Sequence, residues 1–232
     1  MAGEGSDVSR VARSRDQARR SYDRLSRWYD LLSEPSEGPL REAGLRALRV
    51  REGEAVLEIG FGTGHGLVAL ARAVGASGSV HGIDLSPAVL RLARKRVDEA
   101  GLTNRVHLQP GDAMDLPYQD GSFDAVFMSF ALELFDTPEI PVVLHQCRRV
   151  LRTRGRIGVV SMSKMQPTRP VARLYEWAHR RFPGLLDCRP ILVRKSLKDA
   201  GFRIVKAEDR STWGLPVEIV VGEKWERARD KE

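Results

Sequence analysis

The stretch VLEIGFGTGHG, from Val56 to Gly66, runs from an apolar segment into four glycines, each separated from the next by one residue. A short apolar run that ends in glycines is typical of a buried strand that turns into a helix. Glycines at such a turn let a ligand approach the backbone closely, and the helix that follows presents its free N–H groups. The stretch therefore predicts a nucleotide-like cofactor beside the turn.

Two details of this loop separate one class of cofactor from another. Loops of the GxGxxG type also bind nicotinamide and flavin dinucleotides, but in that register His65 takes the place of the third glycine. Glu58 lies at the end of the apolar run, where a carboxylate repels a pyrophosphate and attracts an ammonium or sulfonium group. The loop thus favours a cationic cofactor and disfavours a nicotinamide-dependent oxidoreductase.

Two more acids follow the next two apolar segments. Asp84 ends SVHGID (79–84), 20 positions after Gly64 (84 − 64 = 20), where an acid can accept hydrogen bonds from both ribose hydroxyls. Asp112, in GDAMDLP (111–117), is placed to accept from an exocyclic amine such as that of adenine, with Ala113 beside it. A single acid of this kind can be a helix cap or a solvated turn residue. Three acids after three successive strands indicate a binding site, because parallel sheets bind ligands at their strand C-termini.

Segments of strand composition alternate with helical patterns along most of the chain, which is typical of a parallel sheet covered on both faces. Strands are expected at 55–59, 79–84, 106–110, 123–130 and 156–163, with a closing pair at 202–210 and 217–225. Helix starts are expected at Ser86-Pro87 and Thr137-Pro138, and helix ends at Gly75, Gly101, Gly155 and Gly201. The pattern predicts an α/β, Rossmann-like, doubly wound fold with a mostly parallel seven-stranded sheet and helices on both faces.

The segments that flank this pattern are expected to belong to the same domain, which would cover residues 15–232. Residues 1–14 are polar and unpatterned, which predicts a disordered tail. Residues 15–50 predict a helical annex, and residues 51–163 the cofactor-binding core. Residues 164–232 predict a substrate-side insert, with helices at 168–181 and 191–201, followed by the closing strands.

Composition is that of a globular protein, with 42% hydrophobic and 30% charged residues among 232. No apolar run approaches the ~20 residues that a membrane-spanning helix requires, and the N-terminal segment has no apolar core of the secretory type. Cys147 and Cys188 lack the spacing of a metal site or a disulfide framework. We expect a cytoplasmic protein with reduced cysteines and no metal.

The net charge of +7 is concentrated in the C-terminal part. Residues 1–140 hold 17 Lys/Arg and 21 Asp/Glu (17 − 21 = −4), whereas residues 141–232 hold 21 and 10 (21 − 10 = +11). Such asymmetry indicates an anionic membrane surface, nucleic acid or an acidic substrate, and an arginine-rich composition produces the same bias without a partner. Trp177, Trp213 and Trp225 are candidates for peripheral contact with an anionic membrane, although packing is the commoner use of Trp.

Taken together, the motifs resemble those of the class I S-adenosylmethionine-dependent methyltransferases. VLEIGFGTG, GIDLS, GDAMDLPYQDGSFDAVFMSF and LRTRGRIGVV match that family in order over about residues 50–162. DLPYQDGSFD and SYDRLSRWYDLL are most similar to the ubiquinone/menaquinone-biosynthesis C-methyltransferases, the methyltransferase type 11 group. Two features depart from it: Arg154 replaces a proline common before the fifth strand, and the segments DCRPILV and STWGLPVEIVV do not match the quinone enzymes.

The resemblance implies S-adenosyl-L-methionine as the cofactor and assigns residues to its parts. The methionine moiety would lie against Glu58 and the glycine loop, the ribose and adenine against Asp84, Leu85 and Asp112, and the transferring methyl near Ser129. The implied cofactor-binding residues are Glu58, Gly60, Phe61, Gly62, Thr63, Gly64, Asp84, Leu85, Asp112, Ala113 and Ser129.

Methyl transfer from a sulfonium is an in-line displacement, so the protein's main task is to align the acceptor and to exclude water. A base is needed only if the acceptor must lose a proton, and the sequence identifies none. The candidates for the substrate side are Tyr22, Tyr29, His145 and Asp187, each with a simpler use in packing or on the surface.

The leading hypothesis is methyl transfer to a small or lipid-like acceptor, such as a quinone-type molecule. A phospholipid-amine N-methyltransferase is the near alternative, because it needs the same cofactor fold and access to a membrane. A nucleic-acid methyltransferase is disfavoured, because MSFALELF lacks the Asn/Asp-Pro-Pro-aromatic signature for a flipped base. A non-catalytic partner subunit is disfavoured by the intact loop and acids, and the oligomeric state is left open.

Overall fold

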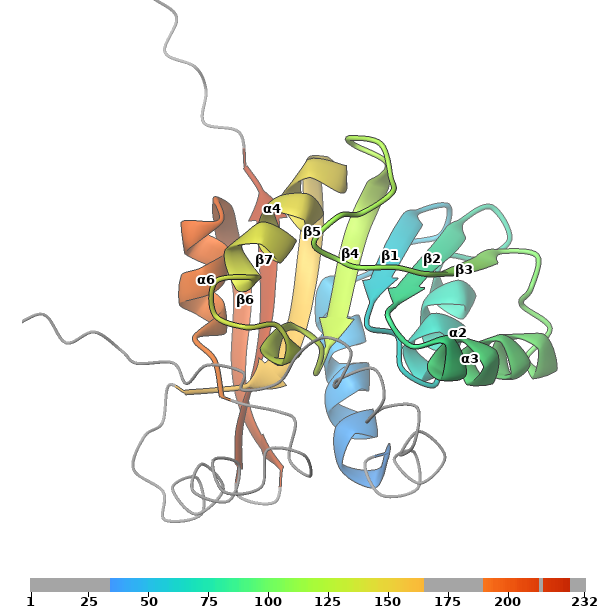
Figure 1. The fold of residues 1–232 in the computed structure, drawn as a ribbon, viewed down its shortest axis with the longest axis horizontal. Coiled ribbons are helices and arrows are strands. Elements are labelled where there is room, and N and C mark those ends of the chain that lie inside the picture. Colours follow the sequence, from blue (N-terminus) through green and yellow to red (C-terminus); the bar gives the residue numbers. More distant parts are fainter. Residues whose placement is uncertain (1–33, 165–189, 213–214, 226–232) are drawn as a thin grey trace, which may run out of the picture.

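The strands form one seven-stranded sheet in the computed structural model, which describes residues 34–164, 190–212 and 215–225 (Figure 1). Their order is β3-β2-β1-β4-β5-β7-β6. Neighbours run parallel except at β7, which is antiparallel to both β5 and β6. The strands are β1 (Ala55–Ile59), β2 (Ser79–Asp84), β3 (Val106–Pro110), β4 (Phe123–Ser129), β5 (Leu151–Met162), β6 (Phe202–Thr212) and β7 (Leu215–Lys224). The predicted doubly wound α/β fold is confirmed.

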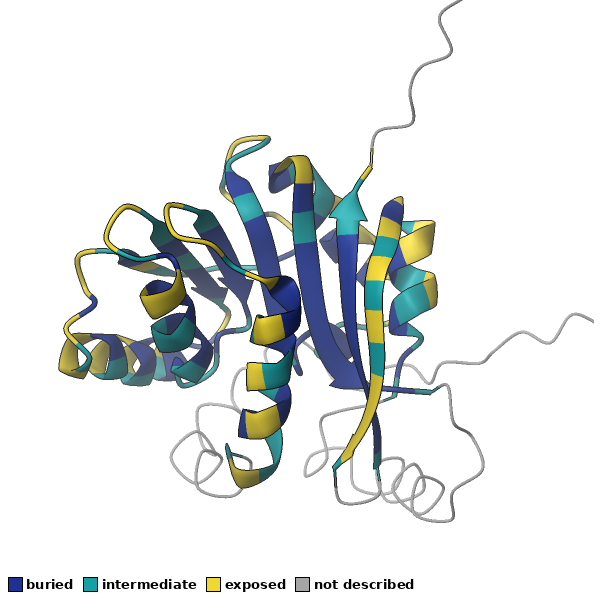
Figure 2. Ribbon diagram, turned by 180° about the vertical axis from the view of Figure 1, so that it is seen from behind, coloured by how far each residue is buried: buried dark blue, intermediate teal, exposed yellow. Residues whose placement is uncertain are grey.

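Helices cover both faces of this sheet, as Figures 1 and 2 show from opposite sides. One face carries the helix of residues 34–48, α2 (His65–Ala73) and α3 (Pro87–Glu99), whose apolar residues share one buried cluster. The other face carries η1 (Leu132–Leu134), α4 (Ile140–Val150) and α6 (Val193–Asp199) over a second cluster. The central strands are therefore buried on both sides: in β1, Val56 belongs to the first cluster and Leu57 to the second.

Exposure follows the position of each strand in the sheet. β5 is continuously buried from Ile157 to Met162 and β7 from Pro216 to Gly222, whereas β6, at the edge, mostly alternates exposed and half-buried residues (Figure 2). Among the described residues, no helix combines the length and the apolar character that crossing a membrane would need.

Most of the predicted helix ends are confirmed. The Ser86 hydroxyl accepts a hydrogen bond from the Val89 N–H (3.2 Å) at the start of α3, with a proline in the first turn. Gly75, Gly101 and Gly201 follow α2, α3 and α6 with φ of 67°, 68° and 83°, the left-handed conformation that glycine adopts without strain.

Two expected boundaries on the α4–β5 segment are wrong. α4 begins at Ile140 rather than at Thr137-Pro138, because residues 136–139 close a turn in which the Asp136 carbonyl accepts from the N–H groups of both Glu139 (2.8 Å) and Ile140 (3.2 Å). Gly155 does not end a helix but lies inside β5, which starts at Leu151 directly after α4 and pairs there with Phe123. The pairing is irregular up to Arg156, which explains why residues 151–155 do not read as a strand.

The C-terminal elements also differ from their expected limits. α6 begins at Val193 and not at residue 191, because Ile191 forms an isolated parallel bridge with Ser163 at the end of β5. The closing strands are longer than expected, since each continues toward the other beyond the predicted ends. The helix predicted at 168–181 and the annex before residue 34 lie outside the described residues.

Candidate functional site

The carboxyl ends of the four parallel strands β1 to β4 bring the predicted acids and the glycine loop together. The Gly60 N–H donates to the Ile83 carbonyl (2.9 Å), and the Gly62 N–H donates to Asp84 Oδ2 (3.3 Å). These two bonds fix the loop after β1 against the end of β2. The Gly111 N–H donates to the Asp84 carbonyl (3.0 Å), which ties the segment that carries Asp112 to the same edge.

The glycines of the loop serve two different purposes. Gly60, Gly62 and Gly64 all have positive φ (67°, 51° and 91°). A Cβ on Gly60 would lie 2.6 Å from Ala131 Cβ, and one on Gly64 would lie 3.1 Å from Ala93 Cα, so these two positions permit close packing of the protein itself. A Cβ on Gly62 would meet no atom of the described residues within 4 Å. The open space beside Gly62 is therefore where a ligand can reach the backbone.

The two residues between these glycines contribute differently. The Phe61 side chain is buried and packs against β2, where a Cβ on Gly82 would lie 2.8 Å from its ring. The Thr63 carbonyl accepts a hydrogen bond from the Arg96 guanidinium. Phe61 can therefore act on a ligand only through its backbone, and Thr63 is anchored to α3.

Glu58 is a buried carboxyl with an unused oxygen. It is 2% exposed, and its Oε2 has no hydrogen-bond partner among the described residues. Burial raises its pKa to about 8; the charge of Asp84 adds to the rise, and the charge of Arg41 opposes it. The first turn of α2 leaves room for this carboxyl only because residue 66 is glycine: a Cβ there would lie 2.0 Å from Glu58 Oε1.

Arg41 and Glu34 are two site residues that the sequence interpretation missed. Arg41 comes from the helix of residues 34–48 and donates two hydrogen bonds to the Glu34 carboxylate (3.0 and 2.5 Å). His65 Nε2 lies 3.6 Å from Glu34 Oε2, which links this pair to the start of α2. A usable signal was present, because Arg41 shares a helical face with the apolar Leu45 and Leu48.

Asp84 is held in place by backbone donors on both oxygens. Its Oδ1 accepts from the Ser86 N–H (3.0 Å) and its Oδ2 from the Gly62 N–H. Burial raises its pKa to about 6 against these hydrogen bonds, which favour the charged form. Leu85, next to it, leaves 39% of its surface exposed, an apolar surface that a planar ring can cover.

The remaining predicted cofactor residues follow β3 and β4. Asp112 Oδ1 accepts from the Met114 N–H (2.9 Å), so the carboxylate is oriented by its own turn, and Ala113 beside it is buried. Ser129 is half-buried at the end of β4, paired with Val160 of β5. These residues flank the open space from the β3 and β4 sides.

The substrate-side candidates are not brought to this edge by the described part of the chain. His145 is exposed on the outer side of α4, away from the sheet. Tyr22, Tyr29 and Asp187 lie outside the described residues. The described residues also contain no cluster of His, Cys, Asp and Glu that could hold a metal ion.

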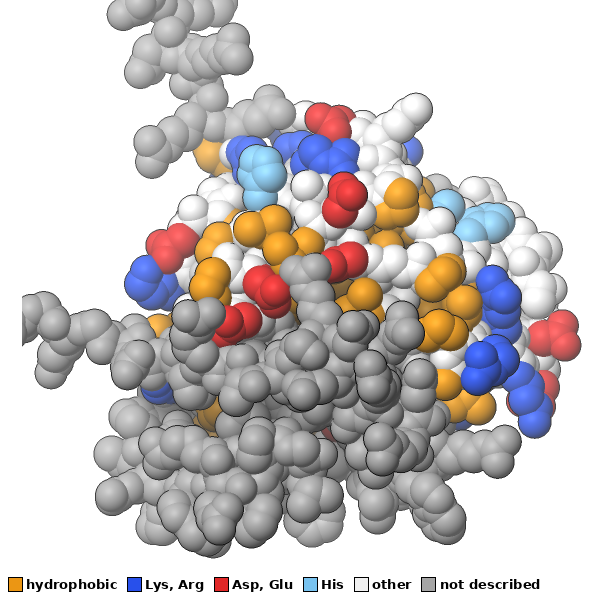
Figure 3. Space-filling view, in the orientation of Figure 1, with side chains coloured by type: hydrophobic (Ala, Val, Ile, Leu, Met, Phe, Trp, Pro, Cys, Tyr) orange, Lys and Arg blue, Asp and Glu red, His pale blue; other side chains and the backbone are white. Residues whose placement is uncertain are grey.

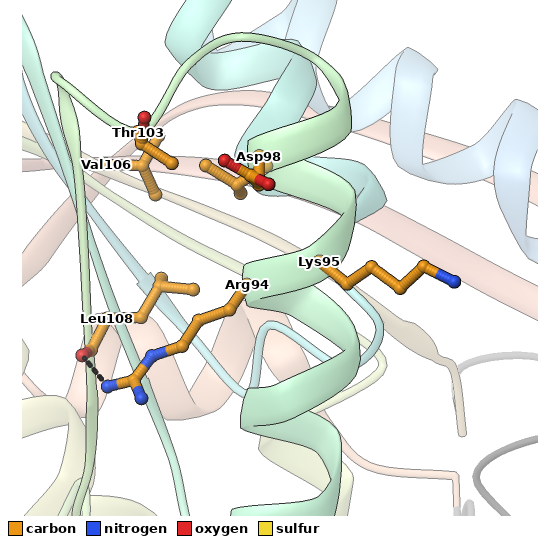
Figure 4. A pocket seen from close by; sticks show the side chains of 7 residues that line it. Arg94, Lys95, Asp98, Thr103, Val106 and Leu108 are labelled. Atoms are coloured by element: carbon orange, nitrogen blue, oxygen red, sulfur yellow. Dashed lines mark hydrogen bonds between the residues drawn. The ribbon is translucent and has the colours of Figure 1, made fainter.

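A separate pocket of about 440 Å³ lies between α3 and β3 (Figure 4). Arg94 reaches across it to the Leu108 carbonyl (3.4 Å), while Lys95 points away. None of the predicted cofactor residues lines this pocket. It is thus distinct from the edge that carries Glu58 and Asp84.

Comparison with known proteins identifies the family. A family model described as a methyltransferase domain matches residues 56–155, the span from the glycine loop into β5. A demethylmenaquinone methyltransferase of Lactobacillus johnsonii is 36% identical over 164 residues, which cover 70% of this chain and 64% of that protein. The chain belongs to the class I S-adenosylmethionine-dependent methyltransferases. The match spans less than two thirds of the length of this relative.

Solved structures agree with the fold of this methyltransferase. The cyclase SpnF superposes with a TM-score of 0.76 at 22% identity, over 95% of this chain and 99% of that one. A SAM-dependent methyltransferase from Aquifex aeolicus gives a TM-score of 0.65 at 22% identity, over 88% and 98%. At 22% identity these likenesses show the fold alone, and proteins of one fold can catalyse different reactions.

The edge of the sheet fits the methyltransferase cofactor, S-adenosylmethionine. Glu58 Oε2 offers an unused acceptor for an ammonium group, and the space beside Gly62 is free for a ligand at the backbone. Asp84 is already oriented by two backbone N–H groups and has the acceptor oxygens that a ribose diol requires.

Proposed function

We propose that this chain transfers the methyl group of S-adenosylmethionine to the ring of a reduced, quinone-type lipophilic acceptor. The observation that carries the methyl-transfer part is the buried Glu58 oxygen, which has no hydrogen-bond partner in the described part of the chain, together with the open backbone at Gly62. The acceptor class is supported by the name of the Lactobacillus johnsonii relative, a demethylmenaquinone methyltransferase.

In this proposal each acid binds one part of the cofactor. The Glu58 carboxylate accepts from the α-ammonium group, and Arg41, held beside it by Glu34, faces the α-carboxylate. Asp84 accepts hydrogen bonds from the ribose hydroxyls, and Leu85 packs on the adenine ring. Asp112 accepts a hydrogen bond from the edge of the adenine, and Ala113 lies beside it. Ser129 lies nearest the methyl group. The bound cofactor supplies an electrophilic methyl on a sulfonium.

What this chain's residues then provide is position and exclusion of water. The buried ends of β1 and β4 and the segment around Phe130 form an apolar wall beside the loop. An in-line displacement gains much of its rate when the acceptor carbon and the methyl carbon are held aligned. The positive charge on sulfur is lost in the reaction, and this loss is easier when water is excluded. A lipophilic ring suits such a wall better than a charged amine does.

The test is transfer of an isotopically labelled methyl group to chemically distinct acceptors. We would incubate the full chain with labelled S-adenosylmethionine and either 1,4-naphthoquinol kept reduced, phosphatidylethanolamine vesicles, or transfer RNA. We expect label on a ring carbon of the naphthoquinol, and less label with Glu58→Gln at a cofactor concentration that does not saturate this variant. Label only on the phospholipid amine would replace this proposal by the N-methyltransferase alternative, and label only on RNA would refute both.

A further inference from the structure

Glu133 is a second buried carboxyl, and it lies beside the glycine loop. It belongs to η1 (Leu132–Leu134), which follows β4, and it is fully buried. Ala131, two residues earlier, is the residue that a Cβ on Gly60 would strike, at 2.6 Å from its own Cβ. The turn that carries Glu133 is therefore packed directly against the loop that follows β1.

The Glu133 carboxyl is bonded to the end of β5 through one of its oxygens, Oε1. β4 and β5 pair as far as Ser129 and Val160, so the Met162 N–H is left without a partner in β4. Glu133 Oε1 accepts from that N–H (3.3 Å), while the neighbouring Ser161 hydroxyl donates to the Met162 carbonyl (3.3 Å). Glu133 Oε2 has no hydrogen-bond partner among the described residues.

The charges around Glu133 favour exchange of a proton near neutral pH. Burial raises the pKa of Glu133 to about 7 against hydrogen bonds from the Ser161 hydroxyl and from the Glu133 and Met162 N–H groups, which favour the charged form. The negative charge of Glu37, on the helix of residues 34–48, adds to the rise. On the other side, Glu218 of β7 lies opposite Ser161 and is paired with Arg194 of α6 (2.7 Å). No cation among the described residues pairs with Glu133 itself.

A purely structural role does not account for an acid at this position. A glutamine would accept the same hydrogen bond from Met162 without a buried ionisable group, whose burial costs stability. An isolated buried carboxyl next to a cofactor site is instead the arrangement in which enzymes tune a base.

We propose that Glu133 is the proton acceptor of the reaction, with Oε2 receiving the hydroxyl proton of a quinol-type acceptor. This inference rests on the proposed function, because it requires an acceptor with an ionisable O–H. As the O–H bond breaks, its electron pair forms a carbonyl, and the ring carbon forms a bond to the methyl carbon. The bond between the methyl carbon and sulfur breaks at the same time, and its electron pair stays on sulfur, which becomes neutral. The methylated carbon then loses its proton to solvent and the carbonyl recovers one from Glu133, so one proton is released overall.

The experiment compares Glu133→Gln with wild type in the full chain, using 1,4-naphthoquinol as the acceptor. With S-adenosylmethionine saturating at every pH, we expect the wild-type kcat/KM for the naphthoquinol to rise with pH through about 7 and then level off. In Glu133→Gln we expect kcat/KM to fall by about 10²- to 10⁴-fold and to lose this rise, as removal of a general base does. Calorimetry should show unchanged affinity for S-adenosylmethionine, and thermal unfolding no loss of stability, because Gln keeps the bond to Met162.

Glu37→Gln is the matched control. It removes a negative charge that raises the Glu133 pKa, so we expect it to keep activity and to move the pH midpoint downward. Equal activity of wild type and Glu133→Gln at every pH would overturn the proposal, and so would loss of cofactor affinity in Glu133→Gln. Wild-type chain that binds S-adenosylmethionine but leaves the naphthoquinol unmethylated would refute the proposed acceptor, and this inference with it.

Discussion

At the scale of single residues, the site depends on carboxyl groups whose environment opposes their ionisation. Burial raises the pKa of both Glu58 and Asp84, the charge of Asp84 raises that of Glu58 further, and Arg41 is the counter-charge that the fold supplies. A cationic ligand relieves this repulsion. Binding of the cofactor should therefore be linked to loss of a proton from the protein.

The first prediction concerns the pH dependence of cofactor affinity. Because the Glu58 pKa is raised to about 8, part of the population carries a protonated Glu58 at pH 7, and an ammonium group binds only the carboxylate. The ratio of the wild-type affinity to that of Glu58→Gln should rise between pH 6 and pH 8, reaching roughly 10- to 100-fold, the range of a charge-assisted hydrogen bond. Taking the ratio removes the titration of the cofactor's own amine. A ratio that is flat with pH would contradict the assignment, and Glu99→Gln, exposed on α3, is the control.

The raised pKa of Glu58 also predicts how the free energy of unfolding changes with pH. A raised pKa means that the folded chain holds the proton more tightly than the unfolded chain does. The contribution of Glu58 to the free energy of unfolding is therefore full below pH 4.5 and is lost as pH rises through about 8. Chemical denaturation without cofactor should show this loss in wild type and not in Glu58→Gln.

At the scale of elements, the site depends on how closely α2 packs against the end of β1. Gly66 has no side chain, and the Glu58 carboxyl occupies the space where a Cβ would be. The glycine is thus needed for the position of an acid eight residues earlier in the chain.

Gly66→Ala should consequently lower cofactor affinity at least as much as Glu58→Gln, because the new Cβ would lie 2.0 Å from Glu58 Oε1 and the carboxyl must move. Calorimetry with S-adenosylmethionine measures the effect. The control is Gly101→Ala, at a left-handed position after α3 where a Cβ meets none of the described atoms within 4 Å. It should cost about 1–2 kcal/mol of stability and leave affinity intact. Wild-type affinity in Gly66→Ala would show that the position of Glu58 is not critical.

The helix of residues 34–48 contributes Arg41, and Arg41→Met tests its role. Loss of the guanidinium should raise the Glu58 pKa further and weaken binding at pH 7 by about tenfold. Arg46→Met, on the same helix with an exposed Arg46–Glu42 pair, provides the comparison and should bind normally. If both variants bind alike, Arg41 has no part in the site.

At the scale of the whole molecule, Arg156 anchors the helix of residues 34–48 to the sheet. Its guanidinium donates to the Leu48 carbonyl (2.6 Å) and the Arg49 carbonyl (2.7 Å), and to both oxygens of Glu54 (3.0 and 2.7 Å). β5, the start of β1 and the end of the helix are joined through this one side chain. The position of Arg41 in the site therefore depends on a contact at the C-terminal end of the same helix.

Arg156→Met should lower the free energy of unfolding by about 2–4 kcal/mol, since it leaves Glu54 and two carbonyls without their donor. Affinity for the cofactor should fall as well, because the helix that carries Arg41 loses its anchor. Arg210→Met, which removes an exposed pair with Glu208 on β6, should stay within about 0.5 kcal/mol of wild type. Equal stability of the two variants would contradict the anchoring role.

The expected contact with a membrane stays a prediction at this scale. Trp177 and Trp213 lie outside the described residues, and the exposed Trp225 has the Arg203 guanidinium over its ring at 4.3 Å. On the face seen in Figure 3, acidic and hydrophobic side chains occupy the middle of the described part, and Lys and Arg lie toward its periphery.

The sequence by itself determined the succession of strands and helices, the family and the edge of the sheet that carries Glu58, Asp84 and Asp112. Those features are encoded locally, by periodicity, by glycines and by an acid directly after a strand. It could not show that Gly62, and not Gly60 or Gly64, faces open space, or that Glu133 is buried beside the loop. The tertiary structure alone decided these points and the meeting of Arg41 with Glu58, because burial and partners depend on residues far apart in the chain, as the 108 positions between Leu48 and Arg156 illustrate.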